Sequence, residues 1–239
     1  MKKVISLFLL FVFCINLYAC KNDTVDYRFD EAAVRDTISF GSYEQNNIHD
    51  DGSEPIQWLV LAKDSNKLLL ISTQLLDIYQ YNSNENSVTW EDCTLRAWLN
   101  STFYEAAFNA DERNVIVTTE VFTEGVQQRV YSSLLEKWVN AADPMPDCTT
   151  SDKIFILSEK ELHQYFRSNT AVVAKPTTYT KLATANKAVH TDCWYTRTPA
   201  DTVGAQKIVE SSGFSNSGGA SNECFLGVRP CIWVSVGNP

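Results

Sequence analysis

The apolar residues of this chain come in short runs, and this pattern constrains the fold more than any other feature. Residues 56–61 and 67–72 are two such runs, with the turn-forming cluster Asp64-Ser65-Asn66 between them. Short apolar runs bounded by turn residues are typical of β-strands. Because 44% of the residues are hydrophobic, a disordered chain is excluded. We therefore expect a folded domain built on short strands, with 56–61 and 67–72 forming a hairpin.

A smaller part of the chain carries helix signals. Thr89 is a candidate N-cap for a helix over residues 90–100, where Leu95, Trp98 and Leu99 would share one apolar face. This spacing predicts a short amphipathic helix that packs on the sheet.

Further helices are expected later in the chain. Capping-box patterns begin at Asn109 and Ser158. Residues 126–139 have an apolar residue at every fourth position, which predicts a helix inside a surface insertion at 124–150. The fold class expected from these signals is α+β, a mainly antiparallel sheet with two or more short helices.

The last third of the chain indicates strands and loops. Six of the nine glycines follow Val203. Residues 194–197, 205–210 and 228–236 have strand composition, whereas 211–223 is rich in Ser, Gly and Asn. We expect a long loop at 211–223.

The N-terminus has the pattern of an export signal. Met1-Lys2-Lys3 precedes an apolar run at residues 7–15, which is shorter than the ~20 residues that a membrane-spanning helix needs. Leu17-Tyr18-Ala19-Cys20 resembles the lipobox of bacterial lipoproteins, in which the signal is cut before a cysteine that then carries lipid. We expect a signal peptide at 1–19 and a lipid on Cys20. The alternative is an ordinary signal peptide that is cut after Ala19, with Cys20 a plain thiol.

Residues 20–36 are polar and acidic, and we expect them to tether a single domain at 37–239 to the membrane through the lipid on Cys20. An acidic stretch after the lipid cysteine is similar to surface-export signals of some Gram-negative bacteria. The predicted localisation is therefore the bacterial cell envelope, outside the cytoplasm. A formal net charge of −9 argues against a nucleic-acid partner, which requires a basic surface.

Export permits disulfides, and the cysteine count is odd. Of seven cysteines, Cys14 lies in the signal and Cys20 is the lipid site. We predict a disulfide between Cys193 and Cys224, because it would close the loop-rich C-terminal region. No C-x-x-C pattern occurs, so no zinc ribbon or thioredoxin-like site is expected. The cysteines left for the domain are Cys93, Cys148, Cys193, Cys224 and Cys231.

Several motifs in this order resemble a bacterial extracytoplasmic domain-of-unknown-function family that is common in host-associated bacteria. The most specific pair is Leu95-Arg96-Ala97-Trp98-Leu99-Asn100 followed by Gly227-Val228-Arg229-Pro230, and Trp194-Tyr195-Thr196-Arg197 lies between them. The resemblance covers residues 37–236. That family is similar to the C-type-lectin-like fold, which formylglycine-generating enzymes share, so the resemblance implies such a fold here.

The sequence departs from that family at two places. Trp194-Tyr195-Thr196 stands where the family tends to have two tryptophans and a leucine, and Cys231 stands where it tends to have a small residue. Formylglycine-generating enzymes hold copper with a close cysteine pair, but the residues around Cys224 and Cys231 do not match, so no metal or other cofactor is expected.

A candidate ligand surface follows from the C-terminal motifs. Aromatic side chains can stack on sugar rings, and Arg and Asn supply hydrogen bonds. The residues expected to line this surface are Trp194, Tyr195, Arg197, Asn222, Glu223 and Arg229. The alternative is that Trp194 packs in the core and that Arg197 makes a structural salt bridge or carbonyl contact, and Arg229 is open to the same two interpretations.

No catalytic motif accompanies these residues. The three histidines, His49, His163 and His190, stand in no triad context, and no nucleotide-binding loop is present. Asn222 and Glu223 could offer oxygens to calcium, but no dense carboxylate run flanks them, which favours a solvated loop. We expect a surface module that binds a glycan or a protein rather than an enzyme. The alternatives are an enzyme of the same fold that acts on envelope or host material, and a structural surface protein.

Overall fold

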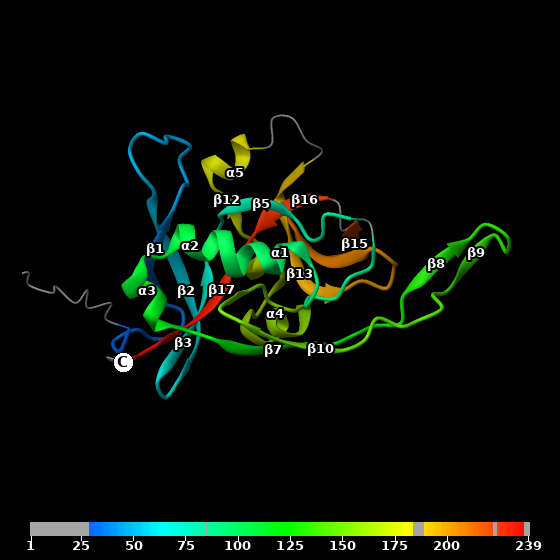
Figure 1. Ribbon diagram of the computed structural model, residues 1–239, viewed down its shortest axis with the longest axis horizontal. Helices are drawn as coiled ribbons and strands as arrows, with labels where there is room; N and C mark the ends of the chain where they lie inside the picture. Colours follow the sequence, from blue (N-terminus) through cyan, green and yellow to red (C-terminus); the bar gives the residue numbers. More distant parts are fainter. Residues whose placement is uncertain (1–28, 85, 184–188, 222–223, 237–239) are drawn as a thin grey trace, which may run out of the picture.

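The computed structural model describes residues 29–84, 86–183, 189–221 and 224–236. Within this part of the chain, two large sheets and several short helices form the body of the molecule (Figure 1). The sheets are mainly antiparallel, so the predicted α+β class is confirmed. The predicted signal peptide and Cys20 lie outside the described residues. No helix of the described segments is long and apolar enough to cross a bilayer.

The first sheet has six strands and confirms the predicted hairpin. Strands β2 and β3 pair antiparallel, with Val60 opposite Leu70. On β2, Ile56, Trp58 and Val60 alternate inward and are fully buried, as a half-buried strand requires. The strands are β1 (Thr37–Tyr43), β2 (Glu54–Asp64), β3 (Lys67–Ser72), β17 (Cys231–Ser235) and β11 (Ile154–Phe155) in spatial order, with β6 (Ile116–Val117) also on β17.

The second sheet has five strands and comes mostly from the last third of the chain. Its spatial order is β15 (Gly213–Ser221), β14 (Ala205–Glu210), β13 (Val189–Pro199), β16 (Phe225–Val228) and β5 (Asp77–Gln80). The loop predicted at 211–223 is wrong for most of its length, because β15 pairs antiparallel with β14. Its small polar residues match a loop by composition, but the long-range pairing supplies the backbone hydrogen bonds of a strand. Asn222 and Glu223 lie outside the described residues.

The helices are short, and several begin where side chains cap them. Asn109 and Ser158 both form the predicted capping boxes. The helix predicted at 90–100 begins later, because the thiol of Cys93, not the hydroxyl of Thr89, accepts a hydrogen bond from Arg96 N. The helices are α1 (Thr94–Trp98), the π-helical turn Leu99–Phe103, α2 (Tyr104–Ala107), α3 (Ala110–Val115), α4 (Glu159–Tyr165), the 3-10 turn Asn169–Val172 and α5 (Thr178–Leu182).

The insertion at 124–150 contains strands, so the predicted helix over 126–139 is wrong. Strand β7 (Thr119–Thr123) pairs with β10 (Cys148–Asp152), and the chain between them forms a projecting hairpin of β8 (Arg129–Ser132) and β9 (Lys137–Asn140) (Figure 1). A four-residue apolar spacing is a multiple of the strand period as well as close to the helical one, and the aromatic and β-branched residues here favour strands.

Two further short strands, β4 (Gln74–Leu75) and β12 (Lys175–Pro176), pair in parallel. They lead into β5 and α5 respectively. Through this pairing, α5 is held beside the start of β5, where the candidate site lies.

Candidate functional site

The C-terminal residues predicted to line a ligand surface are buried. The exposed fraction is 0% for Trp194, 2% for Tyr195, 2% for Arg197 and 3% for Arg229. A side chain without access to solvent cannot present a docking face to a large ligand. For Trp194, Arg197 and Arg229 the packing alternative is therefore correct, and Tyr195, which was expected at the ligand surface, is also buried.

Arg197 joins three elements at one guanidinium group. Its Nη1 and Nη2 donate to Glu161 Oε2 and Oε1 at 2.5 and 2.6 Å, a bidentate pair. The same guanidinium donates to Ile156 O at 2.7 Å, Phe122 O at 3.0 Å and Thr123 Oγ1 at 3.1 Å. Since Glu161 also closes the capping box of α4, this ion pair fixes the helix against β7 and β13.

Arg229 forms no ion pair with a carboxylate of the described residues. It donates to Ser72 O at 3.0 Å and to Val172 O at 2.6 Å, and its guanidinium lies over the rings of Trp194 and Phe166 at 5.1 and 5.5 Å. Burial lowers the pKa of Arg229 to about 10, because the charged form loses its hydration. Carbonyl dipoles and aromatic faces offset that cost.

The residues next to Arg229 and Trp194 are also structural. A Cβ on Gly227 would lie 2.5 Å from Leu75 Cδ1 and 3.1 Å from Cys193 O, so β16 leaves little room for a side chain where it approaches β4 and β13. Tyr195 donates its hydroxyl to Cys224 O at 2.7 Å. Cys193 and Cys224 are free thiols in the structure, so the predicted disulfide between them is not formed.

A different cluster reaches the surface at the start of β5. Five aromatic rings follow one another around this strand, and we call them the aromatic arc: Tyr79, Trp98, Phe103, Tyr43 and Tyr179. Tyr79 stacks on Trp98 with 4.7 Å between ring centroids and 19° between planes. The contacts continue from Trp98 to Phe103 at 5.3 Å, from Phe103 to Tyr43 at 4.9 Å and from Tyr43 to Tyr179 at 6.3 Å.

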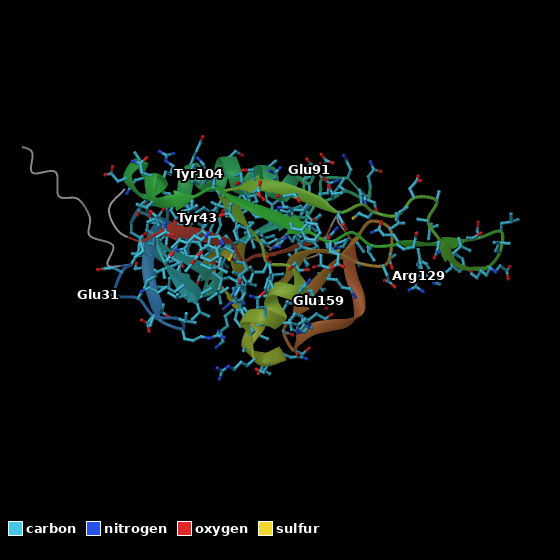
Figure 2. The ribbon with its side chains drawn as sticks, turned by 90° about the horizontal axis from the view of Figure 1, so that it is seen from below. Glu31, Tyr43, Glu91, Tyr104, Arg129 and Glu159 are labelled. Atoms are coloured by element: carbon cyan, nitrogen blue, oxygen red, sulfur yellow. The ribbon has the colours of Figure 1, made fainter. Side chains whose placement is uncertain are left out.

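Phe103 is fully buried and anchors the arc, whereas the other four rings are partly exposed. The rings come from β1, β5, the α1 region and α5. Figure 2 shows that Tyr43 lies on the body of the molecule, far from the projecting hairpin that begins at Arg129.

Asp77 is the charged group of this cluster. Residues two apart on a strand share a face, so Asp77 and Tyr79 project to the same side of β5. The hydroxyl of Tyr43 donates to Asp77 Oδ2, and the backbone N–H of Ile78 donates to Asp77 Oδ1 at 2.6 Å. Among the described residues no basic side chain forms an ion pair with Asp77.

Two pKa values in this cluster are shifted because Asp77 is largely removed from solvent and has no ion-pair partner among the described residues. Burial raises the pKa of Asp77, and the two hydrogen bonds oppose that shift only in part. The negative charge of Asp77 in turn raises the pKa of Tyr179. Groups with perturbed pKa values are common at functional sites.

The loop between β1 and β2 supports the cluster from one side. The backbone N–H groups of Asn46 and Asn47 donate to Glu44 Oε1 at 3.1 and 2.6 Å, and Gln45 N donates to Glu54 Oε2 at 2.6 Å. Tyr179 N donates to Gln45 O at 2.9 Å, which ties α5 to this loop. The carboxylates of Glu44 and Glu54 therefore stabilise the conformation of this loop.

Sequence reasoning missed this cluster. Trp98 was expected on the apolar face of a helix, and Asp77-Ile78-Tyr79-Gln80 was not identified as a strand. The β-branched and aromatic pair Ile78-Tyr79, flanked by the polar residues Asp77 and Gln80, is the signal that could have identified it. Within the described residues, no group of three or more His, Cys, Asp or Glu side chains is placed to hold a metal ion.

Comparison with known families gives one match. The model of a family described as "Domain of unknown function (DUF6273)" matches residues 65–236, which is more than half of the chain. Asp77, Tyr79, Trp98 and Tyr179 lie inside the matched segment, whereas Tyr43 and the β1–β2 loop precede it. No curated protein and no solved structure matches the chain.

Proposed function

The chain belongs to the DUF6273 family, and from this premise we propose that it is a lipid-anchored extracytoplasmic module that binds a glycan at the aromatic arc. The observation that carries the proposal is the Asp77 carboxylate, which lies half-buried among aromatic rings with no basic partner among the described residues. A ligand rich in hydroxyl donors would satisfy its remaining lone pairs.

The chemistry of the cluster matches a sugar. The C–H faces of a pyranose ring pack on aromatic faces, and a carboxylate can accept hydrogen bonds from neighbouring hydroxyl groups. Tyr79 and Trp98 offer partly exposed rings beside Asp77. An anionic ligand is disfavoured, because it would be repelled by Asp77 and by a chain of net charge −9.

Binding fits the cluster better than glycoside hydrolysis. Most glycoside hydrolases use a pair of carboxyl groups that flank the scissile bond. In this cluster the nearby carboxylates of Glu44 and Glu54 accept hydrogen bonds from Asn46, Asn47 and Gln45. Asp77 is the carboxylate that accepts a hydrogen bond from a ring of the arc, Tyr43.

The location rests on the N-terminal sequence. The short apolar run, the lipobox-like Leu17-Tyr18-Ala19-Cys20 and the acidic residues that follow support export and attachment of lipid to Cys20. Labelling with a radioactive fatty acid tests this part: label on the parent chain and none on Cys20→Ser is expected. Equal labelling of both chains, or none on either, would reject the anchor.

A relationship to the C-type-lectin-like fold is part of the same proposal. A sheet-rich α+β body with few, short helices supports it coarsely. The ligand surface proposed here comes from β5, β1 and the two flanking helices, and it does not depend on that relationship.

The test is a glycan array followed by titration of the glycans that bind. Asp77→Asn and Trp98→Ala are each expected to weaken binding at least tenfold, because each removes a direct contact. Phe122→Ala is the matched control, since Phe122 is an aromatic residue that is 54% exposed on β7, outside the arc and the projecting hairpin. No binding by the parent chain, or equal binding by Asp77→Asn, Trp98→Ala and the parent, would reject the proposal.

A further inference from the structure

The projecting hairpin of β8 and β9 is the most apolar exposed part of the described chain. Leu134 is 90% exposed, and Leu135, Trp138, Tyr131 and Val130 are 56%, 53%, 52% and 43% exposed. We call residues 129–140 the arm. Figures 1 and 2 show that the arm extends away from the body, on the side opposite the first described N-terminal residues. Exposed apolar patches of this kind mark interaction surfaces.

The backbone of the arm has one open edge. At the base of β8, Arg129 N donates to Asp201 O at 2.6 Å and Arg129 O accepts from Val203 N at 3.1 Å. The outer edge of β8 is therefore occupied where the arm begins. Among the described residues no second strand pairs with β9.

The register shows which groups of β9 face that open edge. Arg129 is opposite Asn140 and bonds outward, so this is a non-hydrogen-bonded pair, and the pair Tyr131–Trp138 is of the same kind. The backbone N–H and C=O groups of Trp138 and Asn140 consequently point away from β8. They form an unpaired strand edge next to exposed aromatic side chains, which is a template for addition of another strand.

The arm carries few charges, so two copies of the chain repel each other less at the arm than at the rest of their surface. The chain as a whole carries −9, so two copies repel each other. Within the arm the charged residues are only Arg129, Glu136 and Lys137, and Arg129 is already paired with Asp201. The same net charge disfavours insertion of the arm into an anionic lipid surface.

We propose that the arm pairs with the arm of a second copy of this chain, with β9 joining β9 antiparallel. A two-fold axis through Val139 would place Trp138 of one copy opposite Asn140 of the other, and each such pair would exchange two backbone hydrogen bonds. The two Trp138 rings would lie on the same face of the joined sheet, within reach of each other across the diagonal. This inference is independent of the proposed glycan site.

The buried area indicates a weak, reversible dimer. A large aromatic side chain buries about 150–250 Å², so covering the five exposed side chains removes on the order of 500 Å² per copy. That is less than the ~800 Å² per partner of a standard interface. Anchoring on one surface would raise the local concentration of copies and favour the pairing.

Sedimentation equilibrium of residues 20–239 carrying Cys20→Ser, from micromolar to millimolar concentration, tests the proposal. The parent is expected to dimerise, and the double variant Leu134→Asp/Trp138→Asp is expected to raise the dissociation constant at least tenfold. Asn140→Pro should have a similar effect, because it removes one outward N–H and leaves the β8–β9 hydrogen bonds intact. Val34→Asp is the control, since Val34 is 47% exposed outside the arm, and it should dimerise like the parent.

A second measurement needs no variant. In the monomer the N–H groups of Trp138 and Asn140 face solvent, and in the dimer they are hydrogen-bonded. Their hydrogen exchange should therefore slow as the concentration of the chain rises, while exchange at Tyr131 should not change. A parent that stays monomeric, a dimer that persists in both arm variants, or an arm that binds lipid vesicles or another protein while the parent remains monomeric would overturn the proposal.

Discussion

Two clusters of this molecule are built from the same kinds of residue and differ in what surrounds their charges. Around Arg197 and Arg229, each arginine sits in the core and donates to carboxylate, hydroxyl or carbonyl oxygens of neighbouring segments. Around Asp77, aromatic rings also gather, but the carboxylate has no ion-pair partner among the described residues, and four of the five rings reach solvent.

The comparison shows that residue type alone does not identify a ligand surface. Trp, Tyr and Arg are enriched at binding sites, and they are also the side chains that link distant segments inside a core. The difference lies in how completely the charged group is enclosed: both arginines are buried among protein acceptors, whereas Asp77 keeps partial access to solvent. A cluster whose charged group is enclosed and hydrogen-bonded within the protein stabilises the fold. A cluster whose charged group can accept further hydrogen bonds from outside can take a ligand.

The largest effect is expected from Arg197→Ala. The substitution leaves Glu161 without its partner and orphans the backbone carbonyls of Ile156 and Phe122, so the free energy of unfolding should fall by about 3–5 kcal/mol. Urea denaturation followed by tryptophan fluorescence measures this loss. Arg129→Ala is the matched control, because Arg129 is 49% exposed and pairs with Asp201, and a surface pair contributes about 0–1 kcal/mol. Equal losses in the two variants would contradict the role of Arg197.

Arg229→Met should cost less, about 1–2 kcal/mol. The carbonyls of Ser72 and Val172 lose a donor, but the buried charge is removed with no carboxylate left behind, and methionine can pack against Trp194 and Phe166. The same denaturation experiment checks it. If Arg229→Met lowered the free energy of unfolding as much as Arg197→Ala, the carboxylate partner of Arg197 would not explain the difference between the two arginines.

Asp77→Asn should slightly stabilise the chain at neutral pH. Burial raises the pKa of Asp77 above its ordinary value of 3.8, so the folded state holds this proton more tightly than the unfolded state. The ionised carboxylate therefore opposes folding above the raised pKa, and this opposition disappears as the pH falls below 3.8. Thermal unfolding of both chains at neutral pH and near about pH 3 measures the difference. A variant less stable than the parent at neutral pH would assign Asp77 to the fold instead.

The smallest effect is expected at two thiols, Cys193 and Cys224, and concerns their rate of alkylation. Cys193 and Cys224 are partly exposed and form no disulfide in the structure, whereas Cys93, Cys148 and Cys231 are buried. Burial raises the pKa of Cys193 to about 11, so its alkylation by iodoacetamide should be slow at neutral pH and accelerate as the pH rises. Peptide mass mapping of the native chain should find label on Cys193 and Cys224 only. A bridge between these two cysteines would leave both unlabelled.

Features set by neighbouring residues were predictable from the sequence. The β2–β3 hairpin follows from two apolar runs and a turn cluster, and the capping boxes at Asn109 and Ser158 follow from their local patterns. The arm was misread because a spacing of four residues fits both periods, although its β-branched and aromatic residues favour strands. The aromatic arc was missed because Tyr43, Asp77, Trp98 and Tyr179 meet only through tertiary packing, which no periodicity within one element records.

The order of strands in the two sheets has a consequence for how the chain is made. Strand β17 lies between β3 and β11, and β16 lies between β13 and β5, so both sheets receive an interior strand from residues 225–235. Neither sheet can close until that segment has been synthesised and released from the ribosome. Until then each sheet lacks an interior strand, so the two sheets gain their cooperative stability only when β16 and β17 enter them.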